Sequence, residues 1–365
     1  MENNFFKNKK VLIFGHNGFK GSWLVLTLIN LGARVYGISL KNKSKMNFYY
    51  QNKLGRLITE RNLDINDYIS LKKTVLKFQP DIIFHLAAQS LVKRSYENPI
   101  ETWKSNLIGT INILEILRFI KKKCLTVIIT SDKCYLNKEI NRGYLESDEL
   151  GGLDPYGASK GAAEVAIRSH FHSFLKDLKN IKIVSARAGN VIGGGDWNEN
   201  RIVPDCMKSW LNNSIISIRS PNATRPWQHV LDIINGYLSL AYYLDKNSNI
   251  NGMSFNFGPS FKKDYPVIKI VKEIQKNIYD FKFKIKKNKL FKKKIKEAQI
   301  LNLNSSLALK YLKWKPILKI NKTIKLTSEW YSFLKYKKNI REISNSQINT
   351  YLKNLKKNKK HWLNF

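Results

Sequence analysis

The residues with the clearest chemical potential follow an apolar run in the segment VIITSDKCY, residues 127–135. The run has the composition of a buried strand, and it ends on Ser131, Asp132 and Lys133. A strand that ends on a hydroxyl, a carboxyl and an amine presents these groups at the edge of a sheet, where ligands bind. The carboxyl and the amine could act as an acid–base pair. The alternative is an ion pair that only caps the strand, although adjacent side chains on a strand usually point to opposite sides.

A second pair lies in DPYGASKGAAE, which begins at Asp154. Pro155 favours the first turn of a helix, so Tyr156 and Lys160 share one helix face. A lysine ammonium beside a phenol favours the phenolate and lowers the pKa of the tyrosine toward neutrality. Such a phenolate can take the proton of a substrate alcohol while a hydride leaves for a nicotinamide. Tyrosine and lysine also occur at this spacing by chance, so the pair is informative only together with a dinucleotide site.

The segment GHNGFKG, residues 15–21, supplies a candidate dinucleotide site. It follows an apolar run, and its three glycines would let backbone amides approach a diphosphate at the start of a helix. The spacing is GxxGxxG, whereas the usual fingerprint is GxGxxG. The alternative is a tight strand-to-helix turn without a ligand. The expected cofactor-binding residues of this segment are Gly15, Asn17, Gly18, Phe19 and Gly21.

The segment SLKNK, after the second predicted strand, leaves the choice between NAD and NADP open. An acid in this place usually binds the ribose 2′-hydroxyl of NAD, but the segment offers Ser39 and Lys41 and no acid. Lys41 could meet the 2′-phosphate of NADP. Asp64 could hydrogen-bond the adenine amine, or it could simply end a strand. We expect NAD, with NADP as the alternative.

The elements that position these residues follow from the hydrophobic pattern of the first half of the chain. Short apolar runs alternate with amphipathic stretches, as in βαβ units around a parallel sheet. The runs are almost continuously apolar, which indicates a sheet covered on both faces. The expected strands are 10–15, 33–40, 81–87, 125–131 and 181–189, and the expected helices are 20–31, 67–78, 100–120 and 155–176. The predicted fold class is α/β, a Rossmann-type doubly wound parallel sheet with a smaller C-terminal substrate-binding lobe.

Three regions of the chain are expected. Residues 1–189 form the dinucleotide-binding Rossmann domain, which carries the Tyr–Lys pair. Residues 190–342, where loops rich in Gly, Asn and Pro begin, form mainly the substrate-binding lobe, with crossings back to the first domain. Residues 343–365 are expected to be a basic C-terminal tail or surface helix, and 286–297 an exposed basic loop or strand pair.

The net charge of +37 is interpreted as a surface property. The 64 basic residues comprise 52 Lys and 12 Arg, and no zinc-finger spacing or RNP-like motif accompanies them, so no specific nucleic-acid partner is expected. Cys124, Cys134 and Cys206 form no CxxC pair and no cluster with the six histidines, so no metal site is expected. No apolar run reaches the ~18 residues of a membrane span. We expect a cytoplasmic protein that does not bind membranes.

Four motifs in order resemble the extended short-chain dehydrogenase/reductase family: GxxGFxG, HLAAQ at 85–89, the Ser-Asp doublet after an apolar strand, and YxxxK. Within this family the chain is most similar to the nucleotide-sugar 4,6-dehydratases. HNGFKGSWL, TSDKCY, ARAGNVIGGGDW and RPWQHVLD resemble the members that act on CDP-glucose. The resemblance runs from residue 10 to about 258, and more loosely to LKWKP and SEWY near 312–331. Phe14 departs from the pattern, which has Thr or Gly before the first glycine, and should affect only a local turn contact.

The resemblance implies a lyase that converts CDP-glucose to CDP-4-keto-6-deoxyglucose in deoxysugar and polysaccharide biosynthesis. Such enzymes oxidise C4′ with NAD, eliminate water across C5′–C6′ and return the hydride to C6′. Tyr156 and Lys160 would serve the oxidation, and Ser131 would hydrogen-bond the sugar O4′. Asp132 would protonate the leaving hydroxyl and Lys133 would be the base at C5′, where thymidine-linked relatives have Asp-Glu.

The resemblance also implies further binding residues. Besides the glycine segment, the cofactor would contact Ser39, Asp64, Ile65, Leu86, Ala87, Ala88, Asn106, Tyr156 and Lys160. The substrate would contact Gln89, Asn190, Arg201 and Arg225. The two arginines could grip a diphosphate, and Asn106 could instead be a helix-kink residue. A homodimer or homotetramer is expected, because helices such as 100–120 and 155–176 form a four-helix interface in the family.

Two alternative functions are weighed against this one. An epimerase or another dehydratase of the family would act on a differently linked sugar, but an epimerase needs no acid–base pair for elimination, which Asp132 and Lys133 supply. A basic, catalytically silent nucleotide-binding scaffold is the alternative outside enzymes. The presence of Ser131, Asp132, Tyr156 and Lys160 together disfavours it.

Overall fold

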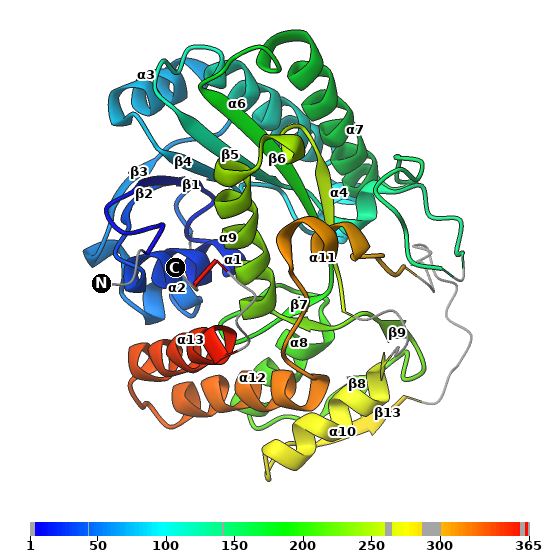
Figure 1. Cartoon of the computed structure of the whole chain (residues 1–365). Helices are drawn as coiled ribbons and strands as arrows, with labels where there is room; N and C mark the ends of the chain where they lie inside the picture. Colours follow the sequence, from blue (N-terminus) through cyan, green and yellow to red (C-terminus); the bar gives the residue numbers. More distant parts are fainter. Residues whose placement is uncertain are drawn as a thin grey trace.

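The computed structural model describes residues 4–42, 44–140, 142–259, 265–286, 301–357 and 362–363. A sheet of seven parallel strands forms the centre of the first lobe (Figure 1). In sheet order the strands are β11 (Ser254–Phe257), β6 (Ile181–Ala188), β5 (Cys124–Ile129), β4 (Ile82–His85), β1 (Lys10–Phe14), β2 (Arg34–Ser39) and β3 (Thr59–Asn62). The strand order reverses between β1 and β4, and ligands of such sheets bind at this switch point.

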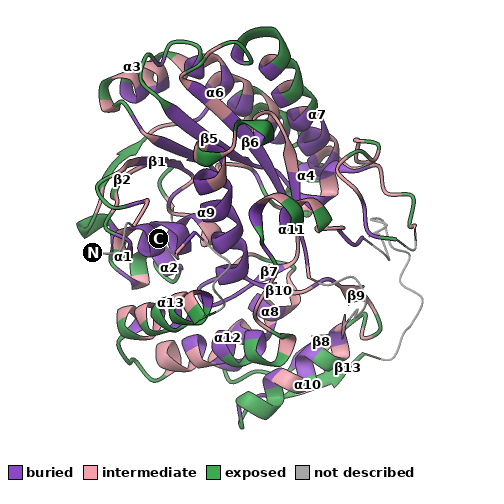
Figure 2. Ribbon diagram, viewed as in Figure 1, coloured by how far each residue is buried: buried purple, intermediate pink, exposed green. Residues whose placement is uncertain are grey.

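Helices cover both faces of the sheet. As a consequence, strands such as β4 and β5 are buried along their whole length (Figure 2). One face is covered by α3 (Tyr68–Phe78), α6 (Gly109–Leu117) and α7 (Pro155–His170). The other face is covered by α1 (Phe19–Asn30) and α9 (Val230–Lys246). The apolar cluster under α1 and α9 continues into the second lobe, so the two lobes share one core. The predicted Rossmann-type sheet is confirmed.

Two predicted helices contain a π-helical turn. After α4 (Val92–Glu97), the predicted helix 100–120 divides into α5 (Pro99–Trp103), the π turn η2 (Lys104–Ile108) and α6. The predicted helix 155–176 runs from α7 into the π turn η4 (Phe171–Leu175). Single π turns are frequent at functional sites, and the first of them carries Asn106.

The second lobe is built from short elements after Gly189. These are β7 (Val191–Ile192), α8 (Ile202–Leu211), β8 (Ile216–Ile218), β9 (Thr224–Arg225), β10 (Gln228–His229), β12 (Tyr265–Pro266), α10 (Val267–Asn277), β13 (Phe283–Ile285), α12 (Ile320–Lys335) and α13 (Ile340–Lys357). Strands β7 and β10, β9 and β12, and β8 and β13 form three small pairs. The chain returns to the first lobe at α9, β11 and α11 (Ser306–Leu312). Smaller elements are α2 (Phe48–Gln51), η1 (Leu54–Arg56) and η5 (Ser248–Ile250).

The C-terminal region is packed against the first lobe and is not a loose tail. The hydroxyl of Tyr351 on α13 donates to Asp232 Oδ1 at 2.8 Å. Trp362 is buried, and its Nε1 donates to Asn235 Oδ1 at 3.0 Å. Both acceptors lie on α9, so the apolar face of α13 covers that helix, while Lys353 and Lys357 of α13 are exposed. Most of 286–297 lies outside the described residues. In the described ranges, no helix has the length and apolar character needed to cross a membrane.

Candidate functional site

The glycine segment closes a tight turn between β1 and α1. Gly15 has a φ of +82°, and a Cβ there would lie 2.7 Å from the nitrogen of Ala87. A Cβ on Gly21 would lie 2.1 Å from the Gly15 oxygen, so neither position tolerates a side chain. Helix α1 begins after Gly18, and its first turn has neither a side-chain cap nor an acidic residue. The amides and the positive end of this helix fit the diphosphate of a dinucleotide.

The other expected cofactor residues lie along the same edge of the sheet. Leu86 donates its N–H to the last carbonyl of β1 at 2.8 Å, and it is half-buried together with Ala87 and Ala88. Ile65 is buried against α6. Asp64 is exposed, and its carboxylate accepts the N–H two residues farther along the chain at 2.9 Å. Asp64 therefore stabilises its own turn, two residues after the end of β3.

Asn106 connects the loop after β4 to the helix that carries the Tyr–Lys pair. Its Nδ2 donates to the Gln89 carbonyl at 3.0 Å and to Ser159 Oγ at 2.9 Å. The side chain of Gln89 is also engaged locally, because it accepts from the Leu91 N–H at 2.7 Å and donates to Thr102 Oγ1 at 2.9 Å. These contacts give Gln89 a role in ordering its own loop. They do not support the substrate contact expected from the sequence.

The hydroxyl, acid and amine that follow β5 form a single tight turn, η3 (Asp132–Cys134). Ser131 accepts from the Lys133 N–H at 3.2 Å and donates to Asp132 Oδ1 at 2.9 Å. Helix α7 packs directly on this turn, since a Cβ on Gly157 would lie 2.9 Å from the Lys133 carbonyl oxygen. Tyr156 precedes that glycine, and it lies close enough to Ser131 for the two hydroxyls to hydrogen-bond.

Burial controls the protonation of the Tyr–Lys pair. It raises the pKa of the Tyr156 hydroxyl to about 12, although the Ser131 hydroxyl acts in the opposite direction. Burial, and then repulsion from Lys20, lower the pKa of the Lys160 amine to about 8. The predicted lowering of the tyrosine pKa is therefore wrong for this structure. The cost of removing a phenolate from water outweighs the attraction of nearby cations.

Lys20 and Tyr237 belong to this site and were not among the residues expected from the sequence. Lys20 lies between the last two glycines of the turn, and its Nζ donates to the Tyr237 hydroxyl at 3.4 Å. Burial and the charge of Arg201 lower the pKa of Lys20 to about 8. Tyr237 is fully buried on α9 and lies near Tyr156. A lysine inside a glycine turn was a visible signal, whereas nothing in the local sequence marks Tyr237.

The start of the second lobe lies against the carboxylate of Asp132. A Cβ on Gly189 would lie 1.8 Å from Asp132 Oδ2, so only glycine fits there. Asn190 has a φ of +51°, a conformation that Asn tolerates, and its Nδ2 donates to Asp132 Oδ2 at 3.5 Å. Arg201 precedes α8 and pairs with Asp196 at 3.3 Å. Its charge reaches both Lys20 and Tyr156.

The remaining expected residues differ in how closely they join this group. Lys133 is half-buried on the turn that holds Asp132. Arg225 lies on β9, at the outer edge of the second lobe in Figure 1, and its Nη1 donates to the Thr224 carbonyl at 2.6 Å. Six of the expected residues thus lie in one group: Ser131, Asp132, Tyr156, Lys160, Asn190 and Arg201. In contrast, Gln89 and Arg225 make local contacts.

A buried ion pair joins α7 to the neighbouring strand β6. Glu164, one turn after Lys160 on α7, pairs with Arg187 of β6 at 2.7 Å. Glu164 also accepts from Thr130 Oγ1 at 2.5 Å and from Ser185 Oγ at 2.9 Å. Because Thr130 directly precedes the Ser-Asp doublet, this carboxylate fixes α7 relative to the end of β5. A charge this deeply buried is tolerated only when it is paired and hydrogen-bonded.

The known sequences that this chain resembles include 4,6-dehydratases and 4-epimerases. A family model described as GDP-mannose 4,6 dehydratase matches residues 12–327. The chain is 41% identical over 263 residues to CDP-glucose 4,6-dehydratase of Salmonella typhimurium, a match that covers 71% of this chain and 73% of the relative. It is 24% identical over 265 residues to UDP-glucose 4-epimerase of Mycoplasma pneumoniae, covering 68% of this chain and 76% of that protein.

Solved structures share the fold. UDP-glucuronic acid 4-epimerase from Bacillus cereus, in complex with UDP-glucuronic acid and NAD, superposes with a TM-score of 0.74 at 21% identity. That match covers 89% of this chain and 99% of the epimerase. UDP-glucose-4-epimerase from Stenotrophomonas maltophila, with bound NAD, gives a TM-score of 0.75 at 18% identity and covers 90% of this chain and 100% of that one. At these identities the likeness concerns the fold alone.

Proposed function

This chain belongs to the GDP-mannose 4,6 dehydratase family, as the motifs predicted, and we propose that it is an NAD-dependent CDP-glucose 4,6-dehydratase. The observation that carries the proposal is the meeting of two acid–base sets in one buried site. Ser131, which caps η3, and Asp132 lie close to Tyr156 of α7. Lys160 follows one turn later on α7, and Lys20 of the glycine turn acts on it. The nucleotide and the sugar are assigned from the similarity to the Salmonella typhimurium enzyme.

The Tyr–Lys pair and Ser131 serve the oxidation of the sugar. In the proposed reaction Tyr156 acts as a phenolate, formed by loss of its own proton before the oxidation, and takes the proton of the C4′ hydroxyl. Because burial raises the pKa of Tyr156, this phenolate depends on the positive charge of Lys160. Ser131 holds the C4′ oxygen by a hydrogen bond. When bound, NAD accepts the hydride from C4′ and returns it to C6′, so it is not consumed.

The η3 turn serves the elimination. The new ketone at C4′ acidifies the hydrogen on C5′, which Lys133 removes, while Asp132 donates a proton to the departing C6′ hydroxyl. Asp132 is held for this task from both sides, by Ser131 on one carboxylate oxygen and by Asn190 on the other. An epimerase does not need these two groups, which is why we place dehydration above epimerisation.

Arg201 is proposed to bind the diphosphate of the substrate. Its side chain is 39% exposed, it lies at the start of α8, and its charge acts on the catalytic residues. A guanidinium in this position can bind phosphate oxygens with two hydrogen bonds. Arg225 is retained as a second candidate, although its described contact is with its own strand.

The decisive experiment supplies the purified protein with NAD and, in separate reactions, with CDP-, dTDP-, GDP- and UDP-linked glucose. Formation of a 4-keto-6-deoxy sugar is read from its ultraviolet absorbance in alkali. We expect product with CDP-glucose only. Product with another nucleotide would change the assigned substrate, and bound dinucleotide without any product would overturn the dehydratase proposal.

A homodimer through the helices α5 and α7 is proposed in addition. The outer surfaces of these helices and of α4, η2 and η4 expose large apolar side chains. They are Tyr96, Ile100, Trp103, Ile108, Val165 and Phe174. Apolar patches of this kind mark protein contacts. In analytical ultracentrifugation, Trp103→Asp should produce monomers and Leu309→Asp, an exposed residue on α11, should not; an unchanged dimer in the first variant would refute this interface.

A cytoplasmic location is also kept as a proposal. Cys124, Cys134 and Cys206 are all free and buried, which suits a reducing compartment.

A further inference from the structure

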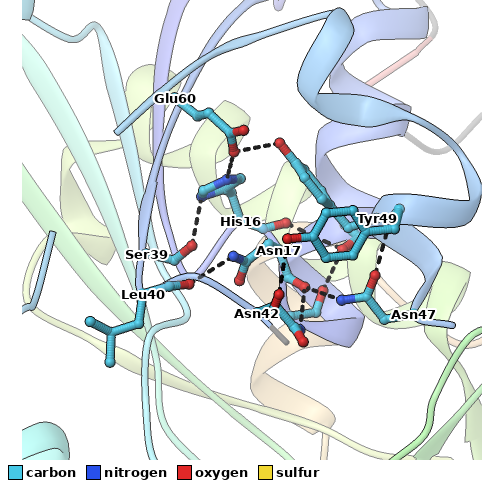
Figure 3. Close-up of polar contacts among 11 residues, drawn as sticks. His16, Asn17, Ser39, Leu40, Asn42, Asn47, Tyr49 and Glu60 are labelled. Carbon is cyan, nitrogen blue, oxygen red and sulfur yellow. Dashed lines mark hydrogen bonds and ion pairs between the residues drawn. The ribbon is translucent and has the colours of Figure 1, made fainter. Parts of the chain in front are cut away.

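A hydrogen-bonded relay of three side chains lies beside the glycine turn (Figure 3). Ser39 Oγ lies 3.1 Å from His16 Nδ1, and His16 Nε2 lies 2.6 Å from Glu60 Oε2. The Tyr49 hydroxyl donates to the same Glu60 oxygen at 2.5 Å. Ser39 ends β2, His16 follows the first glycine, and Glu60 comes from β3, so three separate segments supply the relay.

The backbone holds the imidazole of His16 rigidly in this place. A Cβ on Gly37 would lie 2.4 Å from the ring, so glycine at this position of β2 makes room for it. Glu60 is paired in register with Gly37, which brings its side chain to the far side of the ring. His16 is 2% exposed, whereas Glu60 is 42% exposed. The relay therefore runs from a buried ring to a carboxylate at the surface.

The protons of the relay can be assigned from its chemistry. An ionised carboxylate only accepts hydrogen bonds, so His16 Nε2 carries a proton toward Glu60. Burial lowers the pKa of His16, and a neutral ring with a proton on Nε2 has an acceptor at Nδ1. The Ser39 hydroxyl then donates to Nδ1, which leaves only the lone pairs of its oxygen for a ligand.

We propose that Glu60, acting through His16, makes Ser39 the hydrogen-bond acceptor for the ribose 2′-hydroxyl and thereby selects NAD over NADP. The argument rests on the dinucleotide dependence proposed above. In this fold the end of β2 usually carries an acid that binds this hydroxyl. Here Ser39 occupies that end, and the negative charge comes from β3, two hydrogen bonds away. A 2′-phosphate has no proton to donate when fully ionised, and it would face the Ser39 lone pairs and the Glu60 charge.

The relay also gives the selection a pH dependence. The groups that face His16 are Glu60 of β3, Tyr49 of α2, and Ser39 with the Ile38 carbonyl of β2. In protonated His16 both nitrogens donate, so Ser39 Oγ accepts from Nδ1 and its own hydrogen becomes free to donate to a phosphate. Because burial keeps the pKa of His16 below its ordinary value, the preference for NAD should be complete at neutral pH and weaken in acid.

The test measures dissociation constants of NAD and NADP for the full-length protein by titration calorimetry, without any sugar nucleotide. Glu60→Gln removes the negative charge that holds the ring proton on His16 Nε2, so the ring can carry its proton on Nδ1 instead. The ratio of the NADP and NAD constants should fall by about tenfold or more, the value of one charged hydrogen bond. Ser39→Asp in the Glu60→Gln background should restore the preference, because it returns an acid to β2.

Glu115→Gln is the matched control, since it makes the same change at a surface ion pair on α6 and should leave the ratio unchanged. Equal weakening of NAD and NADP in Glu60→Gln, or no change at all, would overturn the proposal and leave the relay a structural role. That result would not affect the dehydratase proposal, which depends on sugar turnover. Failure of the protein to bind either dinucleotide would overturn both.

Discussion

The proposed catalytic end of the cofactor site and the relay at its proposed adenosine end hold their polar groups in different ways. The catalytic end is defined by Lys20, Tyr156 and Lys160. Burial there favours the neutral form of each group, because it lowers the pKa of both lysines to about 8 and raises the pKa of the tyrosine to about 12. In the relay, His16 and Glu60 form a direct pair at 2.6 Å, and the acid keeps contact with solvent. Burial favours the neutral form at both ends, but in the relay the neutral ring is hydrogen-bonded directly to a carboxylate.

The difference follows from what each end has to do. Proton transfer to and from a sugar requires groups whose charged and neutral forms lie close in free energy. Desolvation brings the two forms of Lys20 and Lys160 closer together at neutral pH, whereas it moves those of Tyr156 apart, so the phenolate needs the positive charge of Lys160.

Recognition of a ribose hydroxyl requires a group that is fixed as hydrogen-bond donor or acceptor. In the relay, the contacts of His16 with Glu60 and Ser39 fix the role of Ser39. We therefore expect the catalytic end to reduce the stability of the fold and the relay to be close to neutral.

Tyr156→Phe should have the largest effect on the reaction. Without the hydroxyl, no group at this position can accept the C4′ proton, and turnover of CDP-glucose should fall by ~10²- to 10⁴-fold. The measurement is formation of the 4-keto sugar under saturating NAD. Tyr243→Phe, on the half-buried end of α9, is the control and should retain full activity. Turnover of Tyr156→Phe within a few-fold of the unmodified protein would remove the assigned role.

Glu164→Gln should have the largest effect on stability. It leaves the Arg187 guanidinium buried without its partner, which typically costs about 3–5 kcal/mol of unfolding free energy. Urea unfolding followed by tryptophan fluorescence measures this loss. Glu97→Gln breaks a pair with Lys93 whose side chains are 55% and 61% exposed, and it should change the unfolding free energy by less than about 1 kcal/mol. Equal effects in the two variants would contradict the assignment of Glu164 as a support of the site.

Lys160→Met should inactivate the protein and stabilise it. The pKa of Lys160 is lowered in the folded state to about 8, so between about pH 8 and 10.4 the unfolded chain binds more protons and stability rises with pH. Below this window both states are protonated and the folded state bears the whole desolvation cost, at most about 3 kcal/mol. At neutral pH the free energy of unfolding of the variant should exceed that of the unmodified protein by up to this amount. Between about pH 8 and 10.4 the variant should lose most of the rise in stability, because it lacks the titrating amine. Urea unfolding of both proteins at neutral pH and in the alkaline window measures the gain in stability and its pH dependence. A variant less stable than the unmodified protein at neutral pH would refute the expectation that the catalytic end reduces the stability of the fold.

Lys133→Ala should separate the two halves of the reaction. Oxidation at C4′ uses other residues, so reduced dinucleotide should accumulate on the protein while product formation falls by ~10-fold or more. The near-ultraviolet absorbance of the reduced nicotinamide during a single turnover shows this. Lys133→Glu should recover part of the elimination, since a carboxylate can also act as the base. Normal turnover in Lys133→Ala would exclude this lysine as the base.

Tyr49→Phe should have the smallest effect. It removes one donor from Glu60 but leaves the His16 contact intact, so stability should fall by about 1 kcal/mol or less. The ratio of the NADP and NAD dissociation constants should stay within about threefold, because Ser39 keeps its acceptor role. Calorimetric titration and urea unfolding of the same preparation measure both quantities. A collapse of NAD preference here would mean that the relay depends on Tyr49 and not on Glu60 alone.

The sequence by itself determined the parts of the protein that depend on short-range pattern. The continuous apolar runs predicted β1, β2, β4, β5 and β6, because a doubly covered parallel strand must be apolar on both sides. The glycine spacing predicted a turn that no side chain can enter, and the spacing of Tyr156 and Lys160 predicted a shared helix face. The strands β3, Thr59–Asn62, and β11 were not among the five expected ranges. The four residues of β3 are all exposed and polar, so no apolar run marks that strand.

Tertiary structure alone decided how distant residues meet and which protonation state each prefers. His16 and Glu60 are separated by 44 residues and Lys20 and Tyr237 by 217, and no local pattern announces either contact. The phenol of Tyr156 was expected to be acidified by its neighbour, yet its pKa is raised. The physical reason is that a pKa depends on how much water the surrounding fold removes, a quantity that residue spacing does not contain.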